Sequence, residues 1–196
     1  MATTKKRSAG RPAKGDTHLN TDAVLDAALV LLDGGGDAAV TFRALARALG
    51  VTPMAVSHHV GSRDEMFVAL VAKVYAGVGD VPTSGTADER VRSMLEQYME
   101  RACAHPNLVQ CVFADPSLMS GELTRLTDAI REYLAASEVP EQHRETVLGV
   151  VVDYTHGFAS SSAAYAVREP RDPGAARGQT IDDYLRGLDW LLGRVE

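Results

Sequence analysis

Acidic, imidazole and hydroxyl side chains occur in this sequence without the partners that catalysis needs. Asp153 and His156 lie three residues apart, which is the spacing of half a di-metal carboxylate site, but no second such pair follows. The serine run 160–162 lacks a strand-turn-helix context for a nucleophile. The glycine run 34–36 follows a predicted helix and lacks a P-loop lysine. The sequence therefore predicts no enzyme, no metal site and no cofactor.

The polar side chains of residues 41–63 lie between closely spaced helix signals. Thr41 can start a short helix that ends at Gly50, and Thr52 with Pro53 supplies an N-cap followed by proline at the first helical position. Two short helices joined by a tight turn are typical of a helix-turn-helix. The apolar positions expected to hold these helices in place are Leu45, Leu49, Val51, Val56 and Val60.

Two further helices frame this motif. An apolar helical face begins at Thr21, the expected N-cap, and the glycine run 34–36 ends it. Ser62 and Glu65 form a capping box that starts the fourth helix.

The rest of the chain also favours helices, because no segment alternates between apolar and polar residues as strands do. After a linker over 77–85, Thr86 and Glu89 form a second capping box, which starts a helix that runs toward His105. Later helices are expected over 107–114, 117–137, 141–167 and 180–194. The predicted fold is all-α, with a disordered basic arm over 1–18, a helix-turn-helix DNA-binding domain over 19–76 and a larger helical domain over 77–196.

Several stretches of the first part occur together and in order: the first helix, Thr41-Phe42-Arg43-Ala44-Leu45-Ala46, Leu49-Gly50-Val51, Thr52-Pro53-Met54-Ala55 and His59-Val60. With them, residues 21–70 closely resemble the DNA-binding domain of TetR-type transcriptional regulators. The resemblance implies that the start of the second short helix meets base edges while other groups bind phosphates. The expected DNA contacts are Thr41, Arg43, Thr52, Pro53, Met54, Ser57, His58, His59 and Arg63, with Arg11 and Lys14 from the arm.

Two of these positions depart from the family pattern. Val56 and Ser57 stand where such regulators usually have Leu-Tyr, and serine is too short to reach the phosphate that tyrosine reaches. That contact is then either lost, replaced through water or supplied by the arm. Arg63 stands where lysine is more common, which keeps the charge and adds a forked donor.

The basic arm has two possible uses on DNA. Its Gly10-Arg11-Pro12 resembles the minor-groove core of an AT-hook, but Ala9 stands where arginine is usual. The arm therefore either adds non-specific attraction to phosphates or reads the minor groove.

The net charge of −6 is unevenly distributed along the chain. Residues 1–75 hold 9 basic and 7 acidic groups, whereas residues 76–196 hold 11 and 19. The first part is thus slightly basic, as a DNA-binding segment requires, and the acidic remainder is free to dimerise and to hold a ligand.

In TetR-type regulators the larger C-terminal domain forms a homodimer and holds a cavity for a small-molecule inducer. The helices expected over 141–167 and 180–194 carry more apolar residues than one buried stripe needs. Two from each subunit could build a four-helix interface, or they could simply fill the core of the monomer. The polar or aromatic residues that interrupt apolar helices are the candidate ligand contacts, although each taken alone is more typical of the core or the surface: Tyr98, His105, Phe113, Tyr154, His156, Phe158 and Ser161.

The cellular setting is read from cysteines and apolar runs. Cys103 and Cys111 lack a metal-type spacing, so a reducing cytosol is the simplest setting. No secretory signal is readable before Thr21, and no apolar run is long enough to cross a bilayer. We therefore expect a cytoplasmic protein with no membrane partner.

Together these features predict a dimeric TetR-type regulator that represses transcription from a palindromic double-stranded DNA operator. An unidentified small-molecule effector would release it. Two alternatives remain at this point: a non-allosteric architectural DNA-binding protein, and a small-molecule-binding helical protein or enzyme with a degenerate DNA domain.

Overall fold

The computed structural model describes residues 19–78, 80, 85–119, 121–168 and 180–192. Within this part the chain forms nine α-helices and no strand, so the predicted all-α fold is confirmed. The helices are α1 (Thr21–Gly35), α2 (Phe42–Leu49), α3 (Pro53–Val60), α4 (Arg63–Val74), α5 (Ala87–Ala104), α6 (Pro106–Ala114), α7 (Gly121–Ala136), α8 (Arg144–Arg168) and α9 (Ile181–Leu191). Short 3-10 turns are η1 (Asp37–Ala39), η2 (Pro116–Leu118) and η3 (Glu141–His143).

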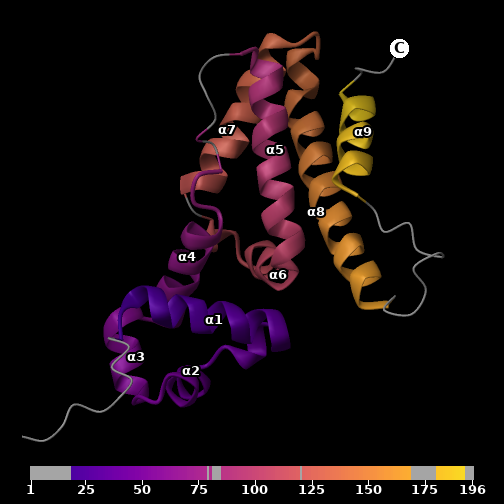
Figure 1. Ribbon diagram of the computed structural model, residues 1–196. Helices are drawn as coiled ribbons and strands as arrows, with labels where there is room; N and C mark the ends of the chain where they lie inside the picture. Colours follow the sequence, from indigo (N-terminus) through magenta and orange to yellow (C-terminus); the bar gives the residue numbers. More distant parts are fainter. Residues whose placement is uncertain (1–18, 79, 81–84, 120, 169–179, 193–196) are drawn as a thin grey trace, which may run out of the picture.

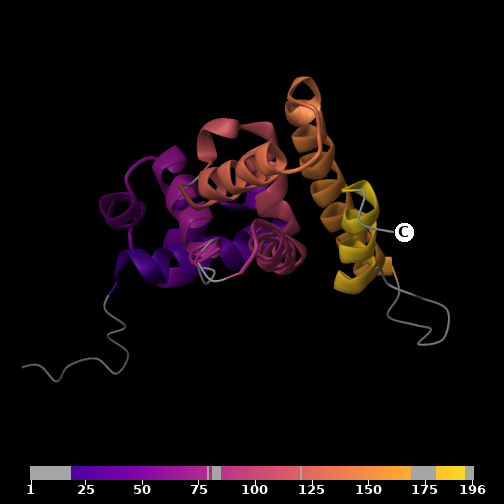
Figure 2. The same cartoon turned by 90° about the horizontal axis from the view of Figure 1, so that it is seen from above.

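The helices form two bodies (Figure 1). Helices α1 to α3 make the N-terminal body, helices α5 to α9 make the C-terminal body, and α4 rises from the first toward the second. Seen from above, α8 and α9 lie at the edge of the molecule that is farther from α3 (Figure 2). A domain boundary between residues 76 and 77 stays a prediction.

Local capping residues fix the N-terminal body. Thr41 and Thr52 each accept a backbone N–H bond at the start of α2 and α3, at 3.1 and 3.2 Å, as expected from their positions. Gly50 ends α2 in the left-handed region, with φ of 69°, which lets the chain turn directly into α3. Leu45 and Val56 are fully buried and hold the two helices on α1.

The expected N-cap of the first helix is wrong by one residue. Asn20 caps α1, because its side-chain oxygen accepts the N–H of Ala23 at 2.8 Å. Thr21 is the first helical residue, and its hydroxyl donates to the carbonyl of His59 at 3.1 Å. Asparagine is at least as good an N-cap as threonine, and the threonine is used to join α1 to the end of α3.

Helix α4 has a local cap at its start and is held on α1 near its other end. The capping box of Ser62 and Glu65 forms as expected. Near the other end the Lys73 ammonium lies 3.2 Å from Asp22 and 2.8 Å from Asp26 of α1. These carboxylates raise the pKa of Lys73, so the ammonium stays charged. A rotation of α4 against α1 would therefore break identifiable contacts.

The C-terminal body surrounds α5, which packs against α6, α7, α8 and α9. The capping box of Thr86 and Glu89 starts it as expected. Two expected boundaries are wrong. The Asp115 side chain accepts from the N–H and hydroxyl of Ser117, so η2 precedes an α7 that begins only at Gly121. The expected helix 141–167 likewise begins as η3, and α8 starts at Arg144.

The C-terminal helix, expected over 180–194, ends earlier than predicted. Helix α9 ends at Leu191, where the N–H of Leu192 closes its last turn, and residues 193–194 lie outside the described part. No helix in the described ranges is both long and apolar enough to cross a membrane.

Candidate DNA interface and ligand cavity

The side chains at the start of α3 are exposed to solvent. Thr52, Pro53 and Met54 are exposed, and the Met54 side chain is 79% accessible without supporting the core. Val56 and Val60 on the opposite side of the helix are buried, as expected for anchors. This division leaves the first turn of α3 free to meet a partner, as a recognition helix requires.

A second group of exposed residues lies at the start of α2. Thr41 and Arg43 are exposed, and the free backbone N–H groups of this first turn lie beside them. Hydroxyl, guanidinium and N–H donors at a helix N-terminus suit a phosphate. Their role in DNA binding stays a prediction.

The last turn of α3 is less available than expected. Ser57 is half buried, and its hydroxyl donates to the carbonyl of Gly61 at 3.2 Å, which fixes the turn into α4. His59 is also half buried, and its carbonyl accepts the Thr21 hydroxyl. His58 is exposed. Of the two histidines, only His58 offers an open side chain to a partner.

Arg63 has a partner within the protein. Its guanidinium forms an ion pair with the Asp37 carboxylate, donates to the Asp37 carbonyl at 3.3 Å and lies 4.5 Å over the ring of Phe67. Asp37 belongs to η1, which packs against α6. The expected phosphate ligand thus sits at the junction of the two bodies. No local signal announced this pair, because 26 residues separate its members.

The remaining expected DNA contacts, Arg11 and Lys14, lie outside the described residues together with the whole arm 1–18. Their contribution stays a prediction.

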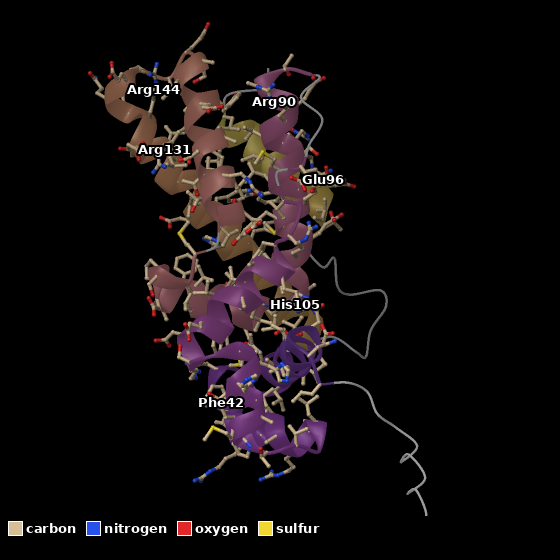
Figure 3. All side chains as sticks on the ribbon, turned by 90° about the vertical axis from the view of Figure 1, so that its left-hand side faces the viewer. Phe42, Arg90, Glu96, His105, Arg131 and Arg144 are labelled. Atoms are coloured by element: carbon tan, nitrogen blue, oxygen red, sulfur yellow. The ribbon has the colours of Figure 1, made fainter. Side chains whose placement is uncertain are left out.

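The C-terminal body contains a partly open cavity of about 370 Å³ between α5, α6, α7 and α8. Its size falls near the lower end of small-molecule pockets, which span roughly 300–1,000 Å³. The lining residues are Leu95, Tyr98, Val112, Met119, Leu123, Thr124, Leu126, Thr127, Ile130, Arg131, Val151, Val152, Thr155 and His156. In Figure 3, Arg131 lies in the part of the molecule that holds this cavity, far from Phe42 at the opposite end.

Two of the expected ligand contacts line this cavity. The Tyr98 hydroxyl lies 2.5 Å from Nε2 of His156, which joins α5 to α8 at one side of the cavity. Burial raises the pKa of Tyr98 and lowers the pKa of His156 to about 4, against a small opposite effect of Asp153. Both side chains are therefore neutral near pH 7.

The other expected ligand contacts lie elsewhere. The rings of Tyr154 and Phe158 pack on Tyr184 of α9, with centroids 5.5 Å from it in both cases. Ser161 donates to the carbonyl of Phe158 at 3.0 Å. Tyr154 and Phe158 thus serve the contact between α8 and α9, and the hydroxyl of Ser161 bonds within α8. Sequence spacing alone could not distinguish these positions from a cavity wall.

His105 and Phe113 also lie outside the cavity lining. Nδ1 of His105 lies 2.9 Å from the Asp33 carboxylate of α1, so the imidazole belongs to the junction between the bodies, where Figure 3 shows it between Phe42 and Arg131. Phe113 is about half exposed, and the centroid of its ring lies 4.4 Å from that of His156. Phe113 therefore supports a cavity residue without lining the cavity.

Sequence reasoning missed the wall that α7 supplies, including Leu123, Thr127 and Ile130. It also missed the stacking of Tyr75, at the end of α4, on the cavity residue Tyr98, with centroids 5.0 Å apart. The apolar residues of α7 recur at helical spacing and look like an ordinary core face, so no signal separates them from core.

Part of the N-terminal body is similar in sequence to a known protein family. Residues 24–70 match the model of the bacterial regulatory proteins of the tetR family. The HTH-type transcriptional regulator BetI of Rhizobium meliloti is 28% identical over 89 residues, which make up 43% of this chain and 44% of BetI. The matched stretch thus spans less than half of that relative.

Solved structures share the whole fold. A structure of BioQ with its natural double-stranded DNA operator superposes with a TM-score of 0.68 at 21% identity, covering 90% of this chain and 97% of BioQ. SCO7222, a TetR from Streptomyces coelicolor, gives a TM-score of 0.66 at 24% identity, covering 89% and 96% of the two chains. At these identities the likeness shows the fold alone.

Proposed function

Because its N-terminal body places this chain in the tetR family of bacterial regulatory proteins, we propose that it is a homodimeric transcriptional repressor released from a palindromic operator by a small molecule. The observation that carries the proposal is the division of α3, with its first turn open and its other side buried. Such a helix can enter a major groove without disturbing its own support.

Each exposed group has a role that suits its chemistry. Thr52 can exchange a hydrogen bond with a base edge or a phosphate, and Met54 can make only apolar contacts, for example with a thymine methyl. Thr41 and Arg43 at the start of α2 suit a phosphate and would set the register. Base preference is thus assigned to α3 and general affinity to α2.

A dimer follows from the needs of recognition. One helix-turn-helix reads too few bases to stand out against non-specific DNA, whereas two related by a two-fold axis read both halves of a palindrome. Exposed apolar side chains on α8 and α9 support a self-complementary contact there: Val150 is 45% exposed and Trp190 is 72% exposed. Both helices lie at one edge of the molecule, where a second copy can approach (Figure 2).

Release by a ligand requires a connection between the cavity and α3. Tyr98 lines the cavity and stacks on Tyr75 at the end of α4, and α4 in turn begins directly after α3. A ligand that moves α5 against α4 would therefore change the position of α3 and the spacing of the two recognition helices. Thermodynamic linkage requires that DNA weakens ligand binding by the same factor.

The test is selection of the preferred duplex from random DNA, followed by titration at several salt concentrations. We expect a palindrome, bound about 10³-fold or more tightly than random duplex at equal salt. Equal affinity for all duplexes would instead establish an architectural protein, and ligand binding without DNA binding would establish a degenerate DNA domain. A reporter with the selected palindrome inside its promoter tests the repressing sign.

A further inference from the structure

The polar side chains around the cavity are almost all engaged within the protein. Thr127 donates to the carbonyl of Leu123 at 2.9 Å. Thr155 donates to the carbonyl of Val151 at 2.7 Å and lies 2.9 Å from the Tyr184 hydroxyl. Thr124 is engaged as well. Thr127 and Thr155 have thus used their one O–H as a donor and can only accept a hydrogen bond from a ligand. Most of the other lining side chains are apolar.

His156 is the exception among the lining side chains. Its Nε2 lies beside the Tyr98 hydroxyl, but its buried Nδ1 has no hydrogen-bond partner among the described residues. Leaving such a buried group unpaired is unfavourable, because its hydration is lost and no hydrogen bond replaces it. Because protein atoms cover this nitrogen, a ligand would reach it only if the imidazole rotated toward the cavity, and the new hydrogen bond would then satisfy it. A polar group of a ligand would therefore gain a hydrogen bond at the side of the cavity where His156 lies.

The cavity offers little to a charged ligand. Its one charged lining residue, Arg131, lies at the surface and already pairs with Asp128 at 3.0 Å and Glu145 at 3.2 Å. The imidazole of His156 is neutral because burial keeps its pKa near 4. A carboxylate or ammonium group inside would thus lose its hydration without gaining a counter-ion.

From these walls we infer that the cavity takes a small, uncharged, mostly apolar molecule whose single hydrogen-bonding group lies at His156. A medium-chain alcohol has this chemistry. The inference rests on the proposed function, because it names the class of effector for the same regulator. The effector should also bind the protein in the absence of DNA.

Three probes of equal chain length separate the alternatives: 1-octanol, octanoate and octylammonium. Their binding to the full-length, DNA-free protein is measured near neutral pH by calorimetry and by the shift in melting temperature. We expect 1-octanol to bind, and both ions to bind at least about tenfold more weakly, since an unpaired buried charge costs more than one hydrogen bond. Octanoate or octylammonium that bound as well as the alcohol would overturn the inference, as would the absence of binding by all three.

Variants locate the polar group. His156→Leu should weaken 1-octanol binding by about fivefold or more, the equivalent of one hydrogen bond of about 1 kcal/mol. His143→Leu, on η3 and outside the cavity lining, should leave it unchanged. Val152→Trp fills the cavity and should abolish binding, with a circular dichroism spectrum and melting temperature reported for each variant. Unchanged binding by a folded His156→Leu protein would show that the hydroxyl lies elsewhere.

Operator binding is measured separately on the same preparations. If 1-octanol binds but no palindrome is preferred, the cavity chemistry stands and the regulator function fails. If a palindrome is preferred but only an ion binds the cavity, the regulator function stands and the inferred ligand class is wrong.

Discussion

Thr52 has two uses that a single substitution would confuse. Its hydroxyl caps α3 by accepting the N–H of Ala55, and the same side chain is exposed toward the proposed DNA surface. Met54 has only one of these uses, because its side chain is exposed and does not support the core. Comparing the two residues therefore separates stability from base preference.

Thr52→Ala should lower the free energy of unfolding by about 1 kcal/mol through loss of the cap, whereas Thr52→Ser should change it by a few tenths. Urea unfolding of the two variants measures this difference in stability.

Met54→Ala should leave stability within about 0.5 kcal/mol and yet alter the preferred bases of the selected palindrome. Repeated selection from random DNA measures this change in base preference. An unchanged base preference in the Met54 variant would remove that residue from the interface.

His156 should make stability depend on pH. The folded state keeps the pKa of this imidazole near 4, whereas the unfolded chain has the ordinary value of 6.5. As the pH falls below 6.5 the unfolded state therefore gains a proton that the folded state does not, and the free energy of unfolding falls. The loss from this group should be on the order of 2 kcal/mol between about pH 7 and about pH 5.

Urea unfolding at several pH values checks this expectation. His156→Leu should flatten the pH dependence over that range, while His143→Leu, which changes an exposed histidine, should keep it. Equal slopes in the two variants would show that His156 takes up its proton at the same pH in the folded and the unfolded protein, and the lowered pKa of the folded state would then be wrong.

At the scale of the element, the start of α4 carries a contact that bears on DNA affinity. Arg63 is paired with Asp37 of η1, and this pair competes with any phosphate for the guanidinium. Asp37→Asn should free Arg63 and tighten operator binding by up to about fivefold, the worth of an exposed ion pair. Arg63→Ala should weaken binding to every duplex and reduce the salt dependence by about one phosphate contact.

The control for this prediction is Asp64→Asn, which removes the same charge from an exposed position next to Arg63 in the first turn of α4. Titration of both variants with operator and with random duplex separates a local effect from the general loss of an acidic group. If both variants tighten binding equally, the Asp37 carboxylate does not restrain Arg63.

The elements were predictable to the extent that their signals are local. The caps at Thr41, Thr52 and Ser62 act on residues three positions away, and the sequence placed all three helix starts correctly. The prediction was wrong at 117–118, because a helix was expected directly after Pro116, where the Asp115 side chain holds a 3-10 turn. Local competition of this kind is not visible in hydrophobic periodicity.

The candidate site was less predictable because it depends on contacts between distant elements. The Arg63 and Asp37 pair, and the cavity wall from α7, both arise from packing between helices far apart in the sequence. Among the expected ligand contacts, Tyr98 and His156 were found because a polar group inside an apolar helix is a local signal. The same signal also selected Tyr154 and Phe158, which face α9.

At the scale of the whole molecule, contacts from two helices join the bodies. Tyr75 at the end of α4 stacks on Tyr98, and Asn107 of α6 donates from its side-chain amide to the carbonyl of Leu32 in α1 at 2.8 Å. A change in the cavity therefore has two physical routes to the N-terminal body. Coupling between ligand and DNA also needs a fixed partner, because one recognition helix can change its spacing only relative to another.

The second recognition helix must come from a second subunit, so the proposed coupling between ligand and DNA requires a dimer. Val150→Asp places a charge on the exposed edge of α8, and a two-fold contact would bring the new carboxylates of both subunits into the interface. We expect a monomer in sedimentation experiments, with affinity for the palindrome lowered about tenfold or more toward that for a half-site. Val30→Asp, on α1 and 72% exposed, adds the same charge to the N-terminal body and should remain dimeric. A Val150→Asp protein that stayed dimeric and bound the palindrome normally would move the interface away from this edge.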